Sequence, residues 1–438
     1  MRRYVISILL GIIAFILTGQ GGGAQEPIKV LLSDYVNQFP ERVVFRLQAE
    51  SSASEIDRVT LYYQIRVRGS QAYAYPDFSP GKRVTAQYYF QTNVPPRTYV
   101  PPGTDMSFYW VIQDKAGNKY QTESTPFVYE DVRFQWKSVS GGGITLYYYS
   151  FREVFAQQLL EEAQASVKRL SAQAGITYDR PMKIFAYDSK QDMDPALQER
   201  SEAYTRQTVT MGTVVSPQIM LLLGNHPQVK DTVAHEVSHM VIKQATENPY
   251  VDLPAWLDEG LAMNAEKNVA EQYQFRLNAA VLHDDLLSLK SLSALVGHPA
   301  EVTIFYAEAW SSVKYLLDTY GQEKMADLLR TFKEGNTADG ALKKVYGFDV
   351  EGLDNAWRVS LGLKPRPIAP PSGARELTIP PLQAYGAPPQ PPPAATPSTS
   401  ASGAAALPWG AIGAGIGGVV ILILGAFIFL ARRGIGGD

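Results

Sequence analysis

The sequence predicts an exported protein with an all-β, immunoglobulin-like sandwich, then an α+β domain, and finally a C-terminal transmembrane helix. Short alternating apolar runs fill residues 26–136, as expected for half-buried strands. Apolar residues at helical spacing recur through residues 137–363, which predicts amphipathic helices. Uncharged apolar stretches lie near both ends of the 438-residue chain, and they indicate export and a membrane anchor.

The composition excludes several classes of protein and site. The chain has 40 Lys and Arg residues against 43 Asp and Glu residues, so it lacks the basic excess of a nucleic-acid-binding protein. It has no cysteine, which excludes disulfides, thiolate zinc sites, cysteine nucleophiles and iron–sulfur clusters. Export without cysteine is more typical of bacteria than of animals, so we expect a bacterial protein.

Residues 1–24 have the features of a secretory signal peptide. Arg2 and Arg3 precede an uncharged run from Tyr4 to Thr18, and the small residues Gly22 and Ala24 follow. This pattern predicts export with cleavage near Ala24; an uncleaved anchor is the alternative.

Residues 26–136 contain the apolar runs VVFRLQA, VTLYYQIRV, VTAQYYF, MSFYWVIQD and FVYEDVRFQW. Turn signals such as PPG and DKAGN separate them. Strands of this length and spacing predict an antiparallel sandwich. Binding of substrate or cell wall is one interpretation of this domain, and a structural spacer is the other.

The pattern becomes mixed in residues 137–363. Strands are predicted at ITLYYYS, MKIFAYDS and QIMLLLG, and a helix over residues 154–172. Helical spacing then dominates up to residue 363. A small sheet followed by helices is an α+β arrangement.

A motif for metal binding lies where the predicted sheet gives way to helix. Residues 233–241 read VAHEVSHMV, which contains H-E-x-x-H at His235, Glu236 and His239. On a helix, positions i and i+4 share one face, so both imidazoles can bind one ion while Glu236 lies beside them. Two histidines on a solvated helix face are the alternative.

A catalytic zinc ion keeps three protein ligands and one water, so a third ligand is required. The segment LPAWLDEGLA follows at residues 253–262 and predicts a second helix that begins near Pro254. Asp258 and Glu259 are both candidates. Neighbours on a helix point about 100° apart, so only one of them is expected to face the metal.

The H-E-x-x-H motif followed after twenty residues by W-L-x-E-G-L-A resembles the peptidase MA-like gluzincins, related to thermolysin and aminopeptidase N. The resemblance covers about residues 140–360 and implies a gluzincin-like catalytic domain in residues 137–363. It implies one Zn²⁺ per chain, with His235, His239 and Glu259 as ligands and Glu236 as the general base.

The segment FYAEAW at residues 305–310 resembles the family's Y-x-x-A/G segment. This implies that Tyr306 stabilises the oxyanion of the reaction, and a buried helix tyrosine is the alternative. His226, His283 and His298 are expected to have surface or capping roles, with assistance to the oxyanion open for one of them.

The sequence also departs from the relatives in three places. The G-x-M-E-N segment, whose glutamate binds the free amine in related aminopeptidases, has no counterpart in residues 211–227, so an endopeptidase is favoured. Thermolysin-like enzymes carry an Asp four residues after the glutamate ligand, where this chain has Met263, so no partner is assigned to His235. Residues 218–224 are expected to be the sheet edge that receives the substrate backbone.

The C-terminal part predicts a stalk and an anchor. Residues 364–408 contain 13 of the 29 prolines, and such a segment forms an extended, semi-rigid spacer. Residues 409–431 are apolar and precede Arg432 and Arg433. This predicts a transmembrane helix with residues 432–438 as a cytoplasmic tail and the catalytic domain outside.

Together these observations predict a single-pass cell-membrane protein whose extracellular zinc metallopeptidase domain hydrolyses peptides or proteins, with an endopeptidase favoured. A role as processing or sensor protease for other membrane proteins is compatible with this. The alternative is a surface receptor or adhesin with a degenerate peptidase-like domain, against which the intact Glu236 argues. The sequence predicts no oligomeric state and no nucleic-acid partner.

Overall fold

The computed structural model describes residues 26–65, 69–94, 98–198, 209–269, 271–294, 299–367 and 419–422. The chain divides into two compact units. The first contains the residues up to Gln38 together with Arg42–Phe90 and Asp105–Phe127. The second contains Phe39–Glu41, Gln91–Thr104 and everything from Val128 onward. The domain boundary at residue 136 stays a prediction.

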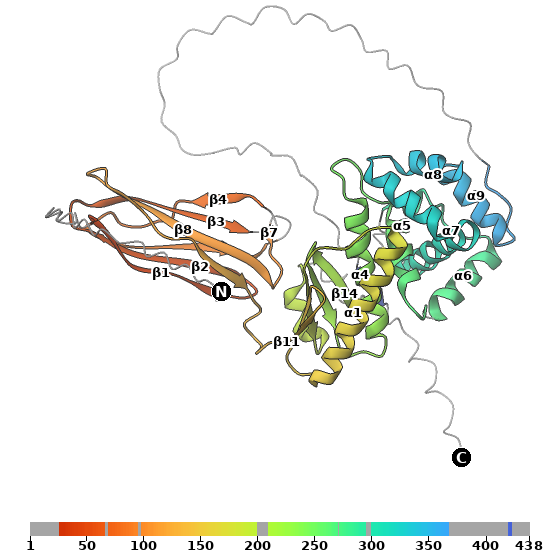
Figure 1. The fold of residues 1–438 in the computed structure, drawn as a ribbon, viewed down its shortest axis with the longest axis horizontal. Helices are drawn as coiled ribbons and strands as arrows, with labels where there is room; N and C mark the ends of the chain where they lie inside the picture. Colours follow the sequence, from red (N-terminus) through yellow and green to blue (C-terminus); the bar gives the residue numbers. More distant parts are fainter. Residues whose placement is uncertain are drawn as a thin grey trace, which may run out of the picture. The chain divides into compact units, whose positions relative to one another are not determined.

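The first unit is built from two antiparallel sheets whose inner faces form one core (Figure 1). The rings of Phe45 and Phe108, one from each sheet, lie 5.0 Å apart in that core. The prediction of an all-β N-terminal region is therefore confirmed. One sheet has the order β1 (Ile28–Gln38), β2 (Arg42–Ser51), β5 (Arg83–Gln91); the other has β10 (Thr125–Tyr129), β8 (Thr104–Asp114), β3 (Ile56–Ile65), β4 (Gln71–Ala74), with β9 (Lys119–Gln121) also on β8.

The second unit contains a six-stranded mixed sheet. Its order is β11 (Lys137–Gly141), β12 (Ile144–Tyr148), β13 (Met182–Tyr187), β15 (Ile219–Leu223), β14 (Val209–Ser216) and β16 (Val419–Leu422). Strands β12, β13 and β15 are parallel, whereas β14 runs antiparallel to β15. Strand β15 is buried along its whole length, which explains its continuous apolar sequence. A two-stranded ribbon, β6 (Asn93–Val94) and β7 (Thr98–Tyr99), also belongs to this unit.

Helices cover the sheet and continue into a helical layer (Figure 1). Helix α1 packs against α4 and against β11 and β12, and α5 packs between α4 and α7. Helix α7 is interrupted at Gly321, whose φ of 82° is left-handed. The helices are α1 (Glu153–Ala174), α2 (Lys190–Met193), α4 (Val229–Thr246), α5 (Ala255–Ala265), α6 (Glu271–His283), α7 (Pro299–Lys333), α8 (Ala338–Tyr346) and α9 (Val350–Ser360), with the 3₁₀ turns η2 (Asp194–Ala196) and η3 (Ser291–Ser293).

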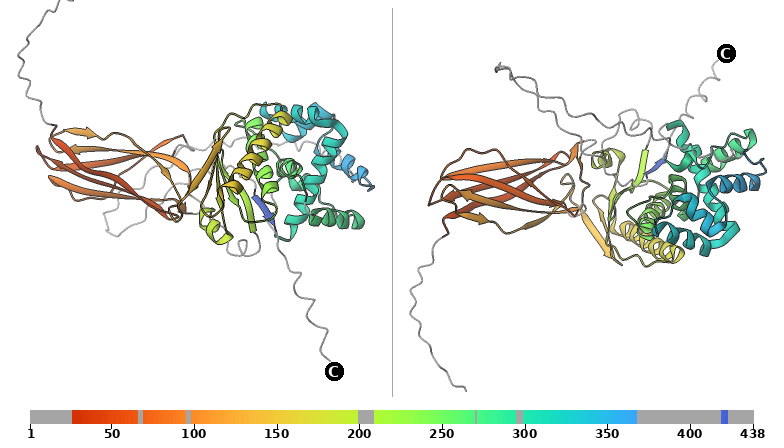
Figure 2. Two further views of the ribbon diagram at one scale, coloured as in Figure 1. Left: turned by 60° about the horizontal axis from the view of Figure 1, so that its bottom comes forward. Right: turned by 90° about the horizontal axis from the view of Figure 1, so that it is seen from above.

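The sheet order corrects one expectation. Residues 218–224, expected at the edge of the sheet, contain β15, which lies inside the sheet between β13 and β14. Strand β14 lies beyond β15 instead, and its outer side pairs antiparallel with β16 (Figure 2, blue strand). The apolar pattern shows that β15 is buried, but it does not show which strand pairs with β15 on the side toward the sheet edge.

The predicted transmembrane helix over residues 409–431 is described only at Val419–Leu422, and these four residues form a strand rather than a helix. Their sequence, Val-Val-Ile-Leu, has high β propensity, and β14 offers an unpaired edge to it. No helix within the described ranges is long and apolar enough to cross a membrane. Residues 1–24, 368–408 and 432–438, with the predicted signal peptide, most of the stalk and the tail, lie outside the described residues.

Candidate zinc site

Helix α4 carries the H-E-x-x-H motif inside the protein. Val233, Val237 and Val241 anchor the helix in the core. His235 is 1% exposed and Glu236 is fully buried. The motif is therefore surrounded by protein and is not on the solvated face that the alternative interpretation required.

Helix α5 brings the third side chain to the two histidines. Pro254 precedes its first turn, and Trp256 and Leu257 are fully buried. Glu259 Oε2 lies 3.4 Å from His235 Nε2 and 3.5 Å from His239 Nε2. Asp258, the other candidate, instead places Oδ2 3.2 Å from His239 Nδ1. Only Glu259 faces both Nε2 atoms.

The three side chains fit a metal ion. One ligand atom from each of His235, His239 and Glu259 lies within 4.8 Å of the others. The two Nε2 atoms and Glu259 Oε2 are buried and have no hydrogen-bond partner in the part of the chain that the structure describes. Buried polar atoms without partners are costly, and two imidazole nitrogens with one carboxylate oxygen are a ligand set of catalytic zinc. A bound Zn²⁺ would satisfy all three atoms.

Each histidine also has an acidic neighbour at its other nitrogen. His235 Nδ1 lies within hydrogen-bond distance of Glu266 Oε1, at 2.7 Å. Such a carboxylate fixes the tautomer and the ring orientation of a metal-binding histidine. Met263, where thermolysin-like enzymes have Asp, is instead buried in the core. The sequence reasoning missed Glu266, and its only signal was an acidic residue two helical turns after Glu259.

Glu236 lies beside the three ligands without an ion pair of its own. Both of its carboxylate oxygens are buried and lack a side-chain hydrogen-bond partner within the described ranges. The backbone of β14 approaches it closely: a Cβ built on Gly212 would lie 2.8 Å from Glu236 Cγ. Gly212 is therefore required for β14 to pass this close to the carboxylate.

The electrostatics of the metal-free cluster follow from burial and from the neighbouring charges. Burial raises the pKa of Glu236 to about 7, against the lowering effect of both histidines. Burial also raises the pKa of Glu259, but His239 and His235 outweigh it and lower that pKa to about 2. For His235, burial lowers the pKa, and Glu259 and Glu266 reverse this and raise it to about 9. The rings therefore hold protons until a metal displaces them.

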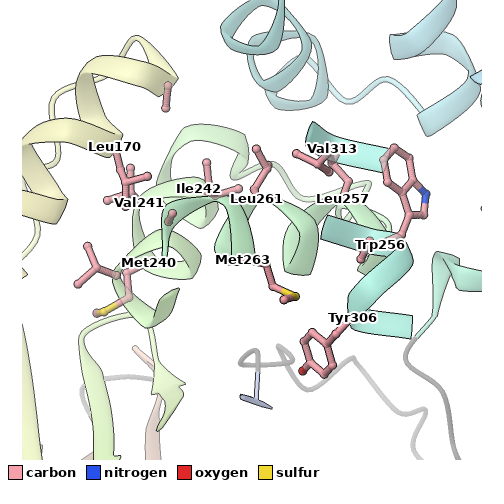
Figure 3. Close-up of a cluster of buried hydrophobic side chains, with 14 of the residues drawn as sticks. Leu170, Met240, Val241, Ile242, Trp256, Leu257, Leu261, Met263, Tyr306 and Val313 are labelled. Atoms are coloured by element: carbon pink, nitrogen blue, oxygen red, sulfur yellow. The ribbon is translucent and has the colours of Figure 1, made fainter. Parts of the chain in front are cut away.

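Tyr306 lies next to the cluster on α7. It is 4% exposed, and its ring centroid is 6.5 Å from that of His235. In Figure 3 its hydroxyl oxygen points away from Trp256. A buried position alone fits both interpretations of Tyr306, but its closeness to His235 is what the oxyanion role requires.

The remaining histidines do not belong to the group of three ligands or lie outside the described residues. His226 Nε2 is 3.4 Å from Thr232 Oγ1, and burial lowers its pKa to about 4. His283 is exposed at the end of α6. His298 lies outside the described residues.

A glycine sets the distance between the helices that carry Glu259 and Tyr306. A Cβ at Gly260 would lie 2.5 Å from Val313 Cγ2 and would collide with the Ala309 carbonyl of α7. Asn264 adds a hydrogen bond from Nδ2 to the Trp310 carbonyl, 3.0 Å long. Figure 3 shows Leu261 of α5 and Val313 of α7 within the same cluster of buried side chains.

Residues 162–362 match the model of a family described as the Peptidase MA superfamily. The match includes α4, α5 and α7, which carry all the side chains of the cluster. Residues 162–362 are a Peptidase MA superfamily domain. The chain is accordingly a zinc-dependent peptidase. His235, His239 and Glu259 are the side chains that could hold its Zn²⁺.

Comparison with curated proteins found no match. Among solved structures, the M1 zinc metallopeptidase from Deinococcus radiodurans is similar, with 13% identity over 79% of this chain and 96% of that chain and a TM-score of 0.33. A variant of that enzyme bound to a Tyr-Ser-Ala substrate has 11% identity over 75% of this chain and 92% of that chain, with a TM-score of 0.34. A likeness this weak does not bear on the activity of this chain.

Replacing Glu266 by Gln should weaken zinc binding about 10- to 100-fold, because His235 loses the carboxylate that orients its ring. The measurement is a zinc titration with a competing chelator. Glu271→Gln, the same change at an exposed position of α6, is the matched control and should leave the affinity unchanged. Equal affinities of the two variants would contradict a role of Glu266 in positioning His235.

Zinc affinity should fall as the pH falls. Because the pKa of His235 is raised to about 9 in the metal-free protein and that of His239 is also raised, each ring must release a proton to bind zinc below that pH. We expect the apparent Kd to rise about tenfold or more for each pH unit between pH 8 and pH 6. Equilibrium dialysis at fixed free zinc measures it, with circular dichroism to check the fold; a constant Kd would show that protons do not compete.

Proposed function

We propose that the chain is a membrane-anchored, extracellular zinc endopeptidase that cleaves peptide or protein substrates beside Glu236. The observation that carries this proposal is the position of Glu236. Its buried carboxylate has no side-chain hydrogen-bond partner among the described residues and lies between the ligand cluster and the backbone of β14. A carboxylate placed in this way is available to take a proton at the reacting centre.

The chemistry follows from the side chains in place. Zinc held by the three ligands would supply a Lewis acid that activates water and polarises the scissile carbonyl. Glu236 takes the proton released in the attack and passes it to the leaving amine.

Tyr306 is proposed to donate a hydrogen bond from its hydroxyl to the developing oxyanion. Its ring lies beside His235 on the firmly packed helix α7. A donor fixed in a buried site stabilises the transition state more than the ground state, because charge develops only in the reaction.

The substrate is proposed to bind as an extra strand on the outer edge of β14. That edge accepts the antiparallel strand β16, so its backbone groups are accessible to an extended chain. Strand β16 is an internal segment, since the chain continues beyond both of its ends. Because this edge can pair with a segment that has chain on both sides, a substrate could bind there without a free terminus. This supports an endopeptidase over an exopeptidase.

The proposed membrane anchor is supported by the apolar residues 409–431 and by the two arginines that follow them, since positive charges mark the cytoplasmic side of a membrane helix. A helix over this segment and strand β16 exclude each other, because the backbone groups of residues 419–422 cannot pair with β14 and within a helix at once. If residues 409–431 insert into the membrane as a helix, β16 does not form, and the outer edge of β14 is accessible to the substrate.

The full chain should cleave peptides that are acetylated at the N-terminus and amidated at the C-terminus, with cuts at internal bonds that mass spectrometry identifies. Glu236→Gln should keep its zinc and lose about 10²- to 10⁴-fold in kcat, because only the proton-transfer group is removed. Glu271→Gln is again the matched control. Cleavage confined to peptides with a free N-terminus would contradict the endopeptidase, and bound zinc with no cleavage at all would favour a receptor.

Tyr306→Phe removes one hydroxyl and keeps the ring in the core. We expect kcat to fall about 10²- to 10³-fold with a smaller change in KM, because the lost hydrogen bond acts on the transition state. Steady-state kinetics of the same blocked peptides measures both constants. An unchanged kcat would show that Tyr306 serves only in packing of the core.

A further inference from the structure

A row of tyrosines crosses the outer face of one sheet of the first unit. Tyr62 on β3 lies directly opposite Tyr73 on β4 and directly opposite Tyr109 on β8. The rings of Tyr62 and Tyr109 stack with centroids 5.0 Å apart, and Tyr73 is 6.2 Å from Tyr62. Tyr75 extends the row, with its ring 5.5 Å from that of Tyr73.

The row leads into a groove between two edge strands. Tyr75, Pro76 and Asp77 form one side, just after β4, and Thr85, Gln87 and Tyr89 of β5 form the other. The groove has a volume of about 530 Å³, within the range of small-molecule sites. We call it the tyrosine groove.

The exposure of these rings is not explained by the fold. The stacked pair Tyr62 and Tyr109 stabilises the sheet as cross-strand neighbours. In contrast, Tyr73, Tyr75 and Tyr89 are 62%, 68% and 51% exposed, so they leave large aromatic surfaces in water. Exposed aromatic side chains gathered in one place are a mark of a binding surface.

The groove is also held in a fixed shape. The hydroxyl of Tyr89 donates a hydrogen bond to Gln87 Oε1, 2.9 Å long. The guanidinium of Arg42 lies 5.5 Å from the centre of the Tyr89 ring, a cation–π distance. A ligand would therefore meet a Tyr89 ring that is already oriented, which lowers the entropic cost of binding.

The chemistry of the lining selects a neutral ligand rich in hydroxyl groups. Asp77 is the one charged side chain among the described residues that line the groove, and the guanidinium of Arg42 is taken up by its contact with the Tyr89 ring, so the lining favours a neutral ligand over an anionic one. The flat rings offer apolar faces to the C–H faces of sugar rings. Thr85, Gln87 and Asp77 stand between them as hydrogen-bond partners for hydroxyl groups.

We propose that the tyrosine groove binds a neutral polysaccharide. The sugar rings stack on Tyr75 and Tyr89, and the row through Tyr73 extends the surface along the polymer. This activity is separate from peptide cleavage and would hold the peptidase on a surface that carries such a glycan. The proposal stands or falls independently of the zinc site.

The test measures retention of the full chain on insoluble cellulose, β-1,3-glucan and chitin, with a polygalacturonate gel as the anionic comparison. We expect binding to at least one neutral polymer and none to the anionic one. The double variant Tyr75→Ala/Tyr89→Ala should bind about tenfold or more weakly. Tyr75→Phe/Tyr89→Phe keeps the rings and should retain most of the affinity.

Tyr250→Ala is the matched control, because Tyr250 is 84% exposed and belongs to the second unit; it should bind like the unchanged chain. Unchanged blocked-peptide cleavage and thermal unfolding would show that the double variant is folded. No retention on any neutral polymer, or equal retention of the double alanine variant, would overturn the proposal. A peptide of residues 380–397 tests the other kind of ligand, because proline-rich segments also dock on aromatic grooves. If the unchanged chain binds this peptide but no polysaccharide, and the double variant does not bind the peptide, the proposal is overturned in favour of proline-rich ligands.

Discussion

Four titratable side chains packed inside an apolar core are the constraint on which the peptidase domain depends. His235, Glu236, His239 and Glu259 are each at most 5% exposed, and buried charges are costly unless they are paired or bind a metal. The helices around them are accordingly buried on several sides: α5 is apolar over most of its surface, as expected for a helix in the interior. Each of these side chains would destabilise the core if it were buried alone. Together, and with an ion bound, they compensate each other's charge.

The motif and its surroundings were predictable because their information is local. The i, i+4 spacing of His235 and His239 fixes a shared helix face, and the continuous apolar run of β15 predicts burial. The choice between Asp258 and Glu259 needed the resemblance, because spacing alone leaves both open, and the structure brings Glu259 to the two Nε2 atoms. Glu266 was beyond sequence reasoning, since its contact with His235 depends on how two helices pack.

The strand order was not predictable for a similar reason. Alternation and apolar runs indicate that a segment is a strand, but pairing partners are set by tertiary packing. Residues 419–422 illustrate the limit: a short apolar run rich in β-branched residues fits a strand and a membrane helix equally well. In the structure, their pairing with the outer edge of β14 makes them a strand. In the sequence, the tyrosines of the first unit are ordinary strand residues. Only the structure shows that Tyr75 and Tyr89 line the same groove.

Glu259 in α5 and Glu266, the residue directly after α5, lie at opposite nitrogens of His235: Glu259 faces Nε2 and Glu266 faces Nδ1. These two carboxylates are seven residues apart in the sequence, a rise of about 10.5 Å along a helix. Inserting or deleting one residue between them would rotate Glu266 by about 100° around the helix axis and away from the ring. Surface loops of such a domain can change in length, whereas the segment from Glu259 to Glu266, which is buried or half-buried throughout, is fixed in length by its two contacts with His235.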